Sequence, residues 1–274
     1  MAKITLFKAG YCTHLACIAI RGAQAKTCQF PAQTALIEAH GRYWLWDTGY
    51  ANHFFDATRV GVYALYPKVT PVYFDSNESM LAQLQAQGLR PQDLSGVILS
   101  HFHGDHIAGA KDFAQTPFIC SNEGWRKMRP LKGISAVRKG YIPELLPPDF
   151  ANQTQFIEQF LQINLPAELA PFTEGYALPN SQQEVIFVPL PGHAAGQIGA
   201  FVQTDDGWVL LAADAAWSKA NFQGKPPSRL AHMLMDDTRA FYQTLEKLAT
   251  LHRNGVPIIL SHEPLNGSIL DSIR

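Results

Sequence analysis

Short apolar runs that end in turn residues recur along this chain and predict a series of β-strands. In the first fifty residues the runs predict consecutive strands of an antiparallel or mixed sheet at residues 4–7, 14–20, 34–38 and 43–47. Later runs predict strands at residues 97–100, 184–189, 201–202, 208–212 and 256–260. The strands at 201–202 and 208–212 are separated by the turn sequence Thr204-Asp205-Asp206-Gly207, which predicts a hairpin.

Helical spacing of apolar positions is confined to fewer segments. Ser76-Asn77-Glu78 precedes a periodic stretch and predicts a capped amphipathic helix that ends at Gly88. Asp236-Asp237 opens a second such helix, with apolar residues at 241, 245, 248 and 251 and a stop at Gly255. We also expect a helix around residues 153–163 and another that begins at 107–109. Residues 51–74 carry many aromatic side chains without a period, so no element is assigned there.

Length and composition indicate a globular protein. The chain has 274 residues, of which 47% are hydrophobic and 16% charged, so we expect one large core and treat residues 1–274 as a single domain. Between residues 121 and 181 the chain is rich in Pro, Gly and aromatics, which predicts an insert that covers the substrate. Its large apolar side chains either line a pocket or simply pack the insert: Trp125, Met128, Tyr141, Phe150 and Phe160.

Charge and hydropathy exclude several classes of partner. The net charge of −1, without runs of like charge, argues against nucleic acid. No segment approaches the roughly twenty apolar residues of a membrane span, and Lys8 and Gly10 interrupt the first apolar run before a signal peptide could form. We therefore expect a cytoplasmic protein. Its cysteines lack metal-binding or disulfide-scaffold spacing and are expected to be reduced thiols: Cys12, Cys17, Cys28 and Cys120.

The candidate chemistry begins where the predicted strand 97–100 ends. His101, His103, Asp105 and His106 follow within six positions, a pattern that residue frequencies predict by chance on the order of once in a thousand chains. In extended backbone, residues i and i+2 lie on the same side, so His101 and His103 can share one cation. Gly104 is expected to permit a tight bend that turns Asp105 and His106 toward a second cation. Without a cation, burying these groups together would be costly.

Other strand ends carry one ligand-type residue each. His193, Asp214 and His262 follow the predicted strands 184–189, 208–212 and 256–260. Asp47 ends the strand 43–47, where it either approaches the metal loop or belongs to an ordinary Asp-Thr-Gly turn. The remaining histidines lack paired ligands and are expected at the surface or in packing, with His14 the one to examine further: His14, His40, His53, His232 and His252.

The order and context of these side chains resemble the metallo-β-lactamase fold superfamily. The resemblance runs from Asp47 to His262 and implies an α+β protein, an αββα sandwich with its site at the sheet edges. It implies that His101, His103 and His193 bind one metal ion and that Asp105, His106 and His262 bind the other. It further implies that Asp214 bridges the two ions and that Asp47 braces the loop.

Such a site would carry two divalent ions. Imidazole and carboxylate ligands without thiolate suit Zn²⁺ best, with Mn²⁺ and Fe²⁺ as alternatives. Two ions about 4 Å apart would share a water molecule and lower its pKa toward neutrality, which gives a hydroxide that attacks an acyl or phosphoryl centre. Asp105 is expected to orient this nucleophile and to shuttle its proton.

The surroundings of the motifs narrow the class of hydrolase. Only twelve residues follow His262. This layout resembles the N-acyl-homoserine lactonase-like branch. Glyoxalase II-type thioesterases have a helical segment after the last histidine, for which these twelve residues leave no room. Class B β-lactamases have cysteine where Asp214 stands. One position departs from the lactonases, which have tyrosine where this chain has Trp217. The Trp217 indole can donate a hydrogen bond to substrate but cannot act as an acid, or it forms an apolar wall.

The sequence therefore predicts a dinuclear metal-dependent hydrolase. Its substrate is expected to be a small lactone, similar to an N-acyl-homoserine lactone, or a related carboxylic ester. Two alternatives remain open at this point: a phosphodiester hydrolase that uses the same site, and a non-catalytic binding module that the metals stabilise. Substrate chain length and oligomeric state do not follow from the sequence.

Overall fold

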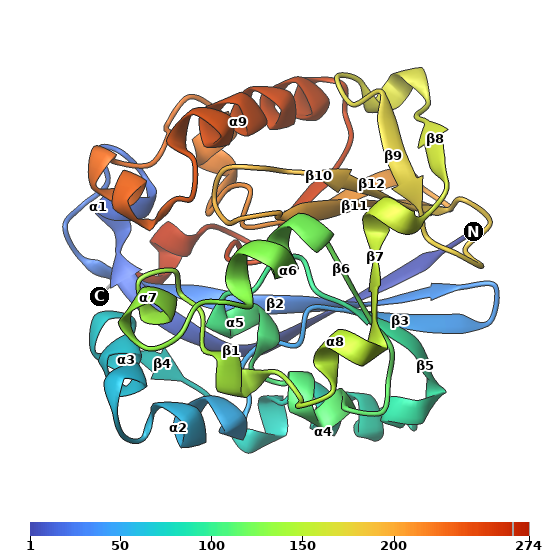
Figure 1. The fold of residues 1–274 in the computed structure, drawn as a ribbon. Helices are drawn as coiled ribbons and strands as arrows, with labels where there is room; N and C mark the ends of the chain where they lie inside the picture. Colours follow the sequence, from blue (N-terminus) through green and yellow to red (C-terminus); the bar gives the residue numbers. More distant parts are fainter. Residues whose placement is uncertain (265, 274) are drawn as a thin grey trace.

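The fold is a sandwich of two β-sheets with helices on both outer faces. A computed structural model describes residues 1–264 and 266–273. One sheet has seven strands in the order β4-β1-β2-β3-β5-β6-β7, and the other has six in the order β13-β12-β11-β10-β9-β8. Figure 1 shows the long helix α9 above the second sheet and α2 and α4 below the first. The predicted αββα sandwich is confirmed.

The strands of the first sheet are β1 (Lys3–Leu15), β2 (Thr27–Ala39), β3 (Arg42–Trp46), β4 (Val72–Tyr73), β5 (Leu94–Ile98), β6 (Phe118–Cys120) and β7 (Thr154–Phe156). Those of the second are β8 (Gln162–Asn164), β9 (Glu174–Ala177), β10 (Val185–Pro189), β11 (Ile198–Thr204), β12 (Gly207–Ala213) and β13 (Ile258–Leu260).

The α-helices are α1 (Ala16–Ala19), α2 (Asn52–Thr58), α3 (Tyr66–Val69), α4 (Met80–Ala86), α5 (Gly104–Ile107), α6 (Asn122–Met128), α7 (Ile134–Val137), α8 (Phe150–Gln153) and α9 (Thr238–Arg253). The 3-10 turns include η1 (Val62–Leu65), η2 (Ser76–Glu78) and η9 (Arg229–Leu234).

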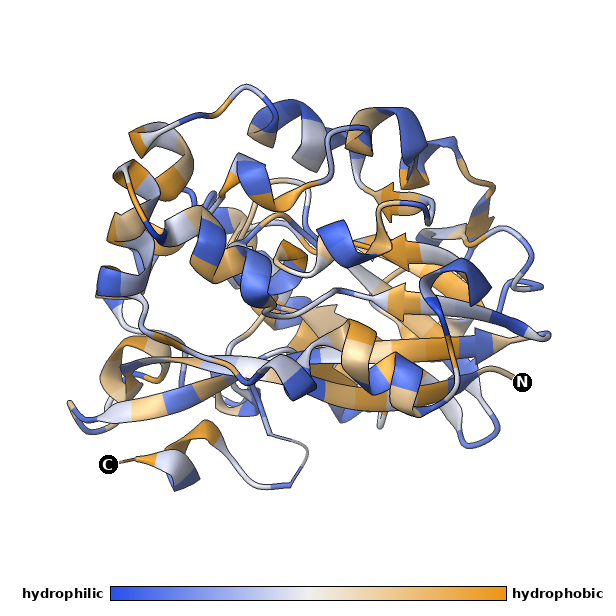
Figure 2. Ribbon diagram, turned by 90° about the horizontal axis from the view of Figure 1, so that it is seen from below, coloured by the Kyte–Doolittle hydropathy of each residue, from blue (hydrophilic) through white to orange (hydrophobic). Residues whose placement is uncertain are grey.

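Successive buried side chains along a strand point alternately to the two faces of its sheet, so apolar residues pack on both faces. In β3, Trp44 and Trp46 pack between the sheets, whereas Leu45 packs toward the helices. In β12, Leu211 faces the other sheet and Leu210 faces outward. This is the side-chain period of two that a strand buried on both faces requires. In Figure 2 the strands are mostly hydrophobic in colour, and many turns and helix surfaces are hydrophilic.

Helix α9 covers the outer face of the second sheet, and its limits match the prediction. The side chain of Asp237 accepts a hydrogen bond from the Ala240 amide at 3.0 Å and so caps the first turn. Phe241, Leu245, Leu248 and Leu251 are buried on the face toward the sheet. Gly255, with φ of +85°, follows the last turn.

Two predictions about local structure are wrong, and a third is right about the end of the helix but not about its start. Residues 14–20 do not form a strand of their own, because β1 ends at Leu15 and α1 follows. The helix expected at 153–163 is replaced by β7, a short turn and β8, which pair with β6 and β9. The helix expected from Ser76 is divided into η2 and α4, and Ser79 caps α4 through the Ala82 amide.

Within residues 1–264 and 266–273, no helix has the length and apolar character needed to cross a membrane.

Candidate metal centre

The first group of predicted ligands lies where β5 leaves the sheet. His101 and His103 are in the loop after β5, and Asp105 and His106 are in α5. Helix α5 begins at Gly104 rather than at the expected residues 107–109, because His103 is the extended residue that precedes it. The chain turns from extended backbone into α5 at Gly104, which has no left-handed conformation, and Asp105 and His106 lie in the second group. Gly104 also leaves space: a Cβ there would lie 3.2 Å from the Tyr66 hydroxyl oxygen.

The second sheet supplies the other predicted ligands from its own strand ends. His193 lies in the loop between β10 and β11, Asp214 follows β12 directly, and His262 follows β13. Residue Ala213, just before Asp214, has a φ of +46°. This left-handed conformation is unfavourable for alanine and re-aims the chain at the end of the strand.

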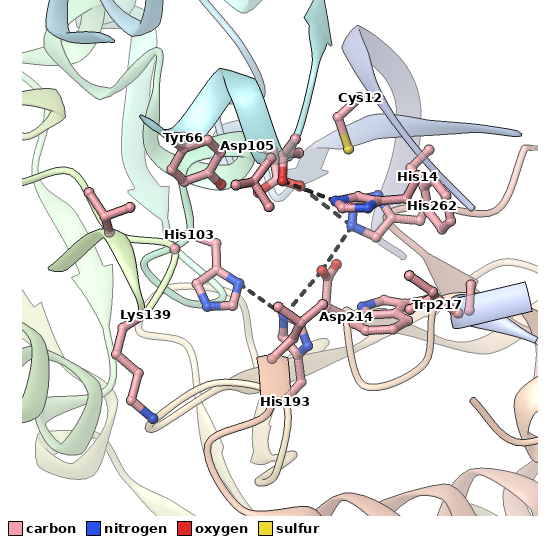
Figure 3. A pocket seen from close by; sticks show the side chains of 18 of the residues that line it. Cys12, His14, Tyr66, His103, Asp105, Lys139, His193, Asp214, Trp217 and His262 are labelled. Carbon is pink, nitrogen blue, oxygen red and sulfur yellow. Dashed lines mark hydrogen bonds and ion pairs between the residues drawn. The ribbon is translucent and has the colours of Figure 1, made fainter. Parts of the chain in front are cut away.

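The structure brings all seven predicted ligand side chains together. Two groups each have their ligand-type atoms within 4.8 Å of one another, and both contain Asp214. The first group is His101, His103, His193 and Asp214, and the second is Asp105, His106, Asp214 and His262. The grouping matches the division that the resemblance implies, although their role as ligands stays a prediction. Figure 3 shows most of these side chains converging on one space.

Asp214 lies between the two groups. Its Oδ2 is 3.3 Å from His193 Nε2 and 2.9 Å from His262 Nε2, and its Oδ1 is 3.3 Å from His106 Nε2. The side chain is almost completely buried. A carboxylate that contacts both groups could serve as a ligand to a cation in each.

The tautomers of two histidines test whether these residues fit a metal ion. Nδ1 of His262 donates a hydrogen bond to the carbonyl oxygen of Pro31 at 2.9 Å, and Nδ1 of His106 donates to Asp47 Oδ2 at 2.8 Å. In a neutral imidazole the other nitrogen, Nε2, then carries a lone pair. Both lone pairs face carboxylate oxygens, so a positive charge is required between them, either a proton or a metal ion.

Unpaired polar atoms point the same way. Among the described residues, Nε2 of His101, Nε2 of His106 and Oδ1 of Asp214 are buried without a hydrogen-bond partner. Nδ1 of His103 and Nε2 of His193 lie 2.9 Å apart, two nitrogens that a single cation could hold together. Buried polar groups are rarely left unpaired, so the donor set fits divalent metal ions.

The pKa values divide the histidines by group. Burial lowers the pKa of His101 and His193 well below the usual value and that of His103 to about 4, so these imidazoles are neutral at pH 7. Burial acts in the same direction on His106 and His262, but the neighbouring carboxylates, Asp105 and Asp214 above all, raise their pKa. In the metal-free protein, the carboxylates of the second group therefore favour the protonated form of both imidazoles.

Asp47 supports the loop rather than the metal space. It follows β3 with a φ of +56° and accepts hydrogen bonds from the Ser100 amide at 2.8 Å, from Ser100 Oγ at 2.7 Å and from His106 Nδ1. Its carboxylate thus fixes both the start of the loop and the orientation of one imidazole. This contact agrees with the bracing role that the resemblance implies.

A cavity of about 320 Å³ opens onto both groups. Trp217 lines it, almost completely buried, with its ring edge-on to His193 at 5.7 Å between centroids. Most of the other lining side chains outside the metal groups are apolar or aromatic, and they include Ile18, Phe30, Val69, Val137 and Leu234. This surface suits the apolar part of a small molecule.

The region predicted to be an insert contributes little of this lining. Only residues 137–140 of it reach the cavity. Phe150 packs instead with Trp125 at 5.0 Å and with Phe102 at 6.0 Å between centroids, and Phe160 packs with Phe187. Of the two interpretations, packing describes the aromatics of the insert.

Sequence reasoning missed several cavity residues. Tyr66, Val69 and Thr70 come from the segment without an assigned element, Cys12 is expected only as a reduced thiol, and Tyr50 carries no sequence prediction. The aromatic density of residues 51–74 was the available signal. His14, the histidine kept for examination, does line the cavity, and its Nε2 lies 3.0 Å from Thr70 Oγ1.

Comparisons with known proteins agree with this geometry. A family model described as the metallo-beta-lactamase superfamily matches residues 29–254. An N-acyl homoserine lactonase of Bacillus cereus is 25% identical over 166 residues, which are 59% of this chain and 52% of the relative. The chain thus spans about half the length of that relative. A probable metallo-hydrolase of Mycobacterium tuberculosis is 25% identical over 84% of this chain and 73% of its own length.

Solved structures share the fold at lower identity. An N-acyl homoserine lactone hydrolase with the product N-hexanoyl-L-homoserine bound at its catalytic metal centre superposes with a TM-score of 0.72 at 21% identity, over 95% of this chain and 92% of that one. A dizinc quorum-quenching lactonase gives a TM-score of 0.65 at 15% identity, over 97% and 89%.

Proposed function

The chain belongs to the metallo-beta-lactamase superfamily, and we propose that it is a dinuclear metal-dependent hydrolase that opens a lactone or cleaves a related carboxylic ester. The observation that carries this proposal is the pair of buried His and Asp groups that share Asp214 and face one cavity. The N-acyl homoserine lactonase among its relatives supports the lactone class.

In this proposal His101, His103 and His193 hold one cation, and Asp105, His106 and His262 hold the other, with Asp214 as ligand to both. Zn²⁺ fits this set of nitrogen and oxygen donors best. When bound, the two ions supply an activated water molecule as nucleophile and polarise the carbonyl group that it attacks.

The protein's own groups prepare the site for this reaction. Asp105 Oδ2 lies 3.4 Å from His262 Nε2 and lines the cavity, so its carboxylate can orient a water molecule and accept its proton. Trp217 forms the opposite wall, where its ring excludes water and its indole N–H is available to the substrate. Deeply buried Asp47 holds the loop of His101 and His103 in place through Ser100.

The cavity lining favours an acyl compound over a phosphodiester. Ile18, Phe30 and Val69 present apolar surface beside the metal groups, which suits a hydrocarbon chain or ring. The open cavity also argues against a purely structural metal site, which needs no access.

The test is hydrolysis by protein loaded with two equivalents of Zn²⁺. We expect turnover of N-acyl-homoserine lactones or other aliphatic lactones and esters, and loss of turnover after chelation that is restored by Zn²⁺. A protein that holds two metal ions yet fails on lactones, esters and phosphodiesters alike would contradict the enzymatic proposal. Turnover of phosphodiesters but not of lactones or esters would show that the enzyme is a phosphodiester hydrolase and would contradict the proposed substrate class.

A further inference from the structure

A tyrosine that the sequence did not single out stands at the wall of the cavity beside Asp105. Tyr66 is the first residue of α3 and lines the cavity. The segment that carries it is fixed to β1, because Cys12 pairs with Val72 of β4 and His14 Nε2 lies 3.0 Å from Thr70 Oγ1. Tyr66 is therefore held at a defined position relative to the site.

The packing around its ring explains where the hydroxyl lies. Phe54 packs edge-on against the Tyr66 ring at 5.3 Å between centroids. On the other side Gly104 leaves room, since a Cβ at this residue would lie 3.2 Å from the hydroxyl oxygen. Gly104 has an ordinary helical backbone, so the space for the phenol is what its missing side chain provides.

The hydroxyl hydrogen of Tyr66 is free to be donated. The hydroxyl lies beside Gly104, whose amide donates to the Gly140 carbonyl oxygen at 3.0 Å, and no described residue accepts a hydrogen bond from Tyr66. A phenol keeps its hydrogen at neutral pH, so the Tyr66 hydroxyl can act as a neutral donor. Figure 3 shows the Tyr66 ring beside Asp105, on the other side of the site from Trp217.

We propose that Tyr66 donates its phenol hydrogen bond to an oxygen of the substrate's ester or lactone group, an inference that rests on the proposed function. Negative charge grows on the ester oxygens as the carbonyl group is attacked. A fixed neutral donor beside them stabilises this charge more than it stabilises the ground state. Tyr66 is thus a catalytic residue that comes from a part of the chain outside the recurrent motifs.

The test is Tyr66→Phe, which keeps the ring on Phe54 and removes only the hydroxyl. We expect kcat for a lactone substrate to fall about 100- to 1000-fold, the range for loss of one such donor, while KM changes by less than about threefold. Metal content and thermal midpoint should stay at their wild-type values. The matched control is Tyr63→Phe, since the Tyr63 hydroxyl accepts from the Gly133 amide at 3.1 Å and Tyr63 does not line the cavity.

Gly104→Ala provides a second variant that retains the phenol. Its methyl group would press on the hydroxyl, so kcat should fall here too. A Tyr66→Phe enzyme with kcat within twofold of wild type would overturn the inference and leave the proposed function standing. A loss of kcat that follows a loss of metal content would make Tyr66 structural and overturn it as well. Wild-type protein without any hydrolysis would overturn the proposed function, and this inference with it.

Discussion

At the residue scale, Asp214 is the side chain on which both metal groups depend. Its carboxylate contacts His193 of the first group and both His106 and His262 of the second, so truncation removes one proposed ligand from each group. We expect Asp214→Ala to lower the metal content of purified protein from two ions per chain to one or fewer, with a loss of hydrolysis of 100-fold or more, on the order expected when a ligand is removed. Elemental analysis of protein dialysed against metal-free buffer measures this. Unchanged occupancy would refute the bridging role.

Substitution of Asp47 tests whether its hydrogen bond to His106 Nδ1 contributes to metal affinity. Asp47→Asn keeps the size and tolerates the left-handed backbone, but it weakens the carboxylate contact with His106 Nδ1. We expect metal affinity to fall about 10- to 100-fold while the fold is retained. Competition with a chromogenic chelator measures the affinity.

The chain contains a matched control for this change. Asp112 Oδ1 lies 2.7 Å from His53 Nε2, a similar pair away from the metal groups. Asp112→Asn should leave metal affinity unchanged. Equal effects of the two substitutions would show that the contact of Asp47 has no special role.

The candidate site residues could be identified from the sequence, but several of their contacts in the structure could not. Closely spaced His101, His103 and Asp105 were detectable because the motif is short and improbable by chance. The space that Gly104 leaves for Tyr66 could not be predicted, because no local pattern records a contact between residues 38 positions apart. Tyr66 was missed for the same reason.

At the scale of elements, the loop after β10 is clamped to the start of α9. Gly192 has a φ of +129°, and its carbonyl oxygen accepts hydrogen bonds from the amides of Asp236 and Asp237, each at 3.0 Å. A Cβ at Gly192 would meet the backbone of Phe241 in α9, far inside van der Waals contact. The helix therefore fixes the loop that carries His193.

Gly192→Ala tests this clamp. We expect the free energy of unfolding to fall by about 3 kcal/mol, because both the backbone conformation and the clash are unfavourable, and the metal content to fall as His193 moves. Urea unfolding measures the stability. Gly207→Ala is the control, because Gly207 also has a positive φ, of +110°, but a Cβ added there would meet no other atom. Its loss in the free energy of unfolding should come from the strained backbone alone. Equal losses would mean that contact with α9 is unimportant.

Elements with a strong period were predictable, and short ones were not. Helix α9 carries four buried apolar residues at helical spacing and clear caps, so its limits followed from the sequence. Residues 153–163 hold two strands of three residues each, too short to show alternation, and their identity depends on pairing with β6 and β9. Such pairing is decided by distant parts of the chain.

At the scale of the whole molecule, the sandwich gathers strand ends from both sheets at one edge. β3 and β5 of the first sheet supply Asp47 and the first histidines, whereas β10, β12 and β13 of the second supply His193, Asp214 and His262. The fold class could be inferred from the order of these motifs by resemblance. The division of the strands into one sheet of seven and one of six could not be inferred, because it depends on which distant strands pair.

The histidine pKa values predict how the metal-free protein responds to pH. His101, His103 and His193 have a lower pKa folded than unfolded, so below pH 6.5 the unfolded chain binds protons that the folded chain does not. The free energy of unfolding should therefore fall as pH drops from 6.5 toward 4, with about 3 kcal/mol from His103 alone. His106 and His262 have a raised pKa, so their stabilising contribution is already complete in this window and is lost only at higher pH.

Urea unfolding of chelator-treated protein at several pH values between 4.5 and 6.5 measures this dependence. His103→Gln removes one titrating group and should make the slope shallower. A free energy of unfolding that is flat, or that rises on acidification, would contradict the assignment of neutral histidines to the first group.

The central claim is that seven side chains hold two cations around Asp214, and anomalous diffraction from Zn²⁺-loaded crystals tests it most directly. We predict two anomalous peaks per chain, one among His101, His103 and His193 and one among Asp105, His106 and His262, with Asp214 in contact with both. A single peak, or peaks away from these residues, would contradict it.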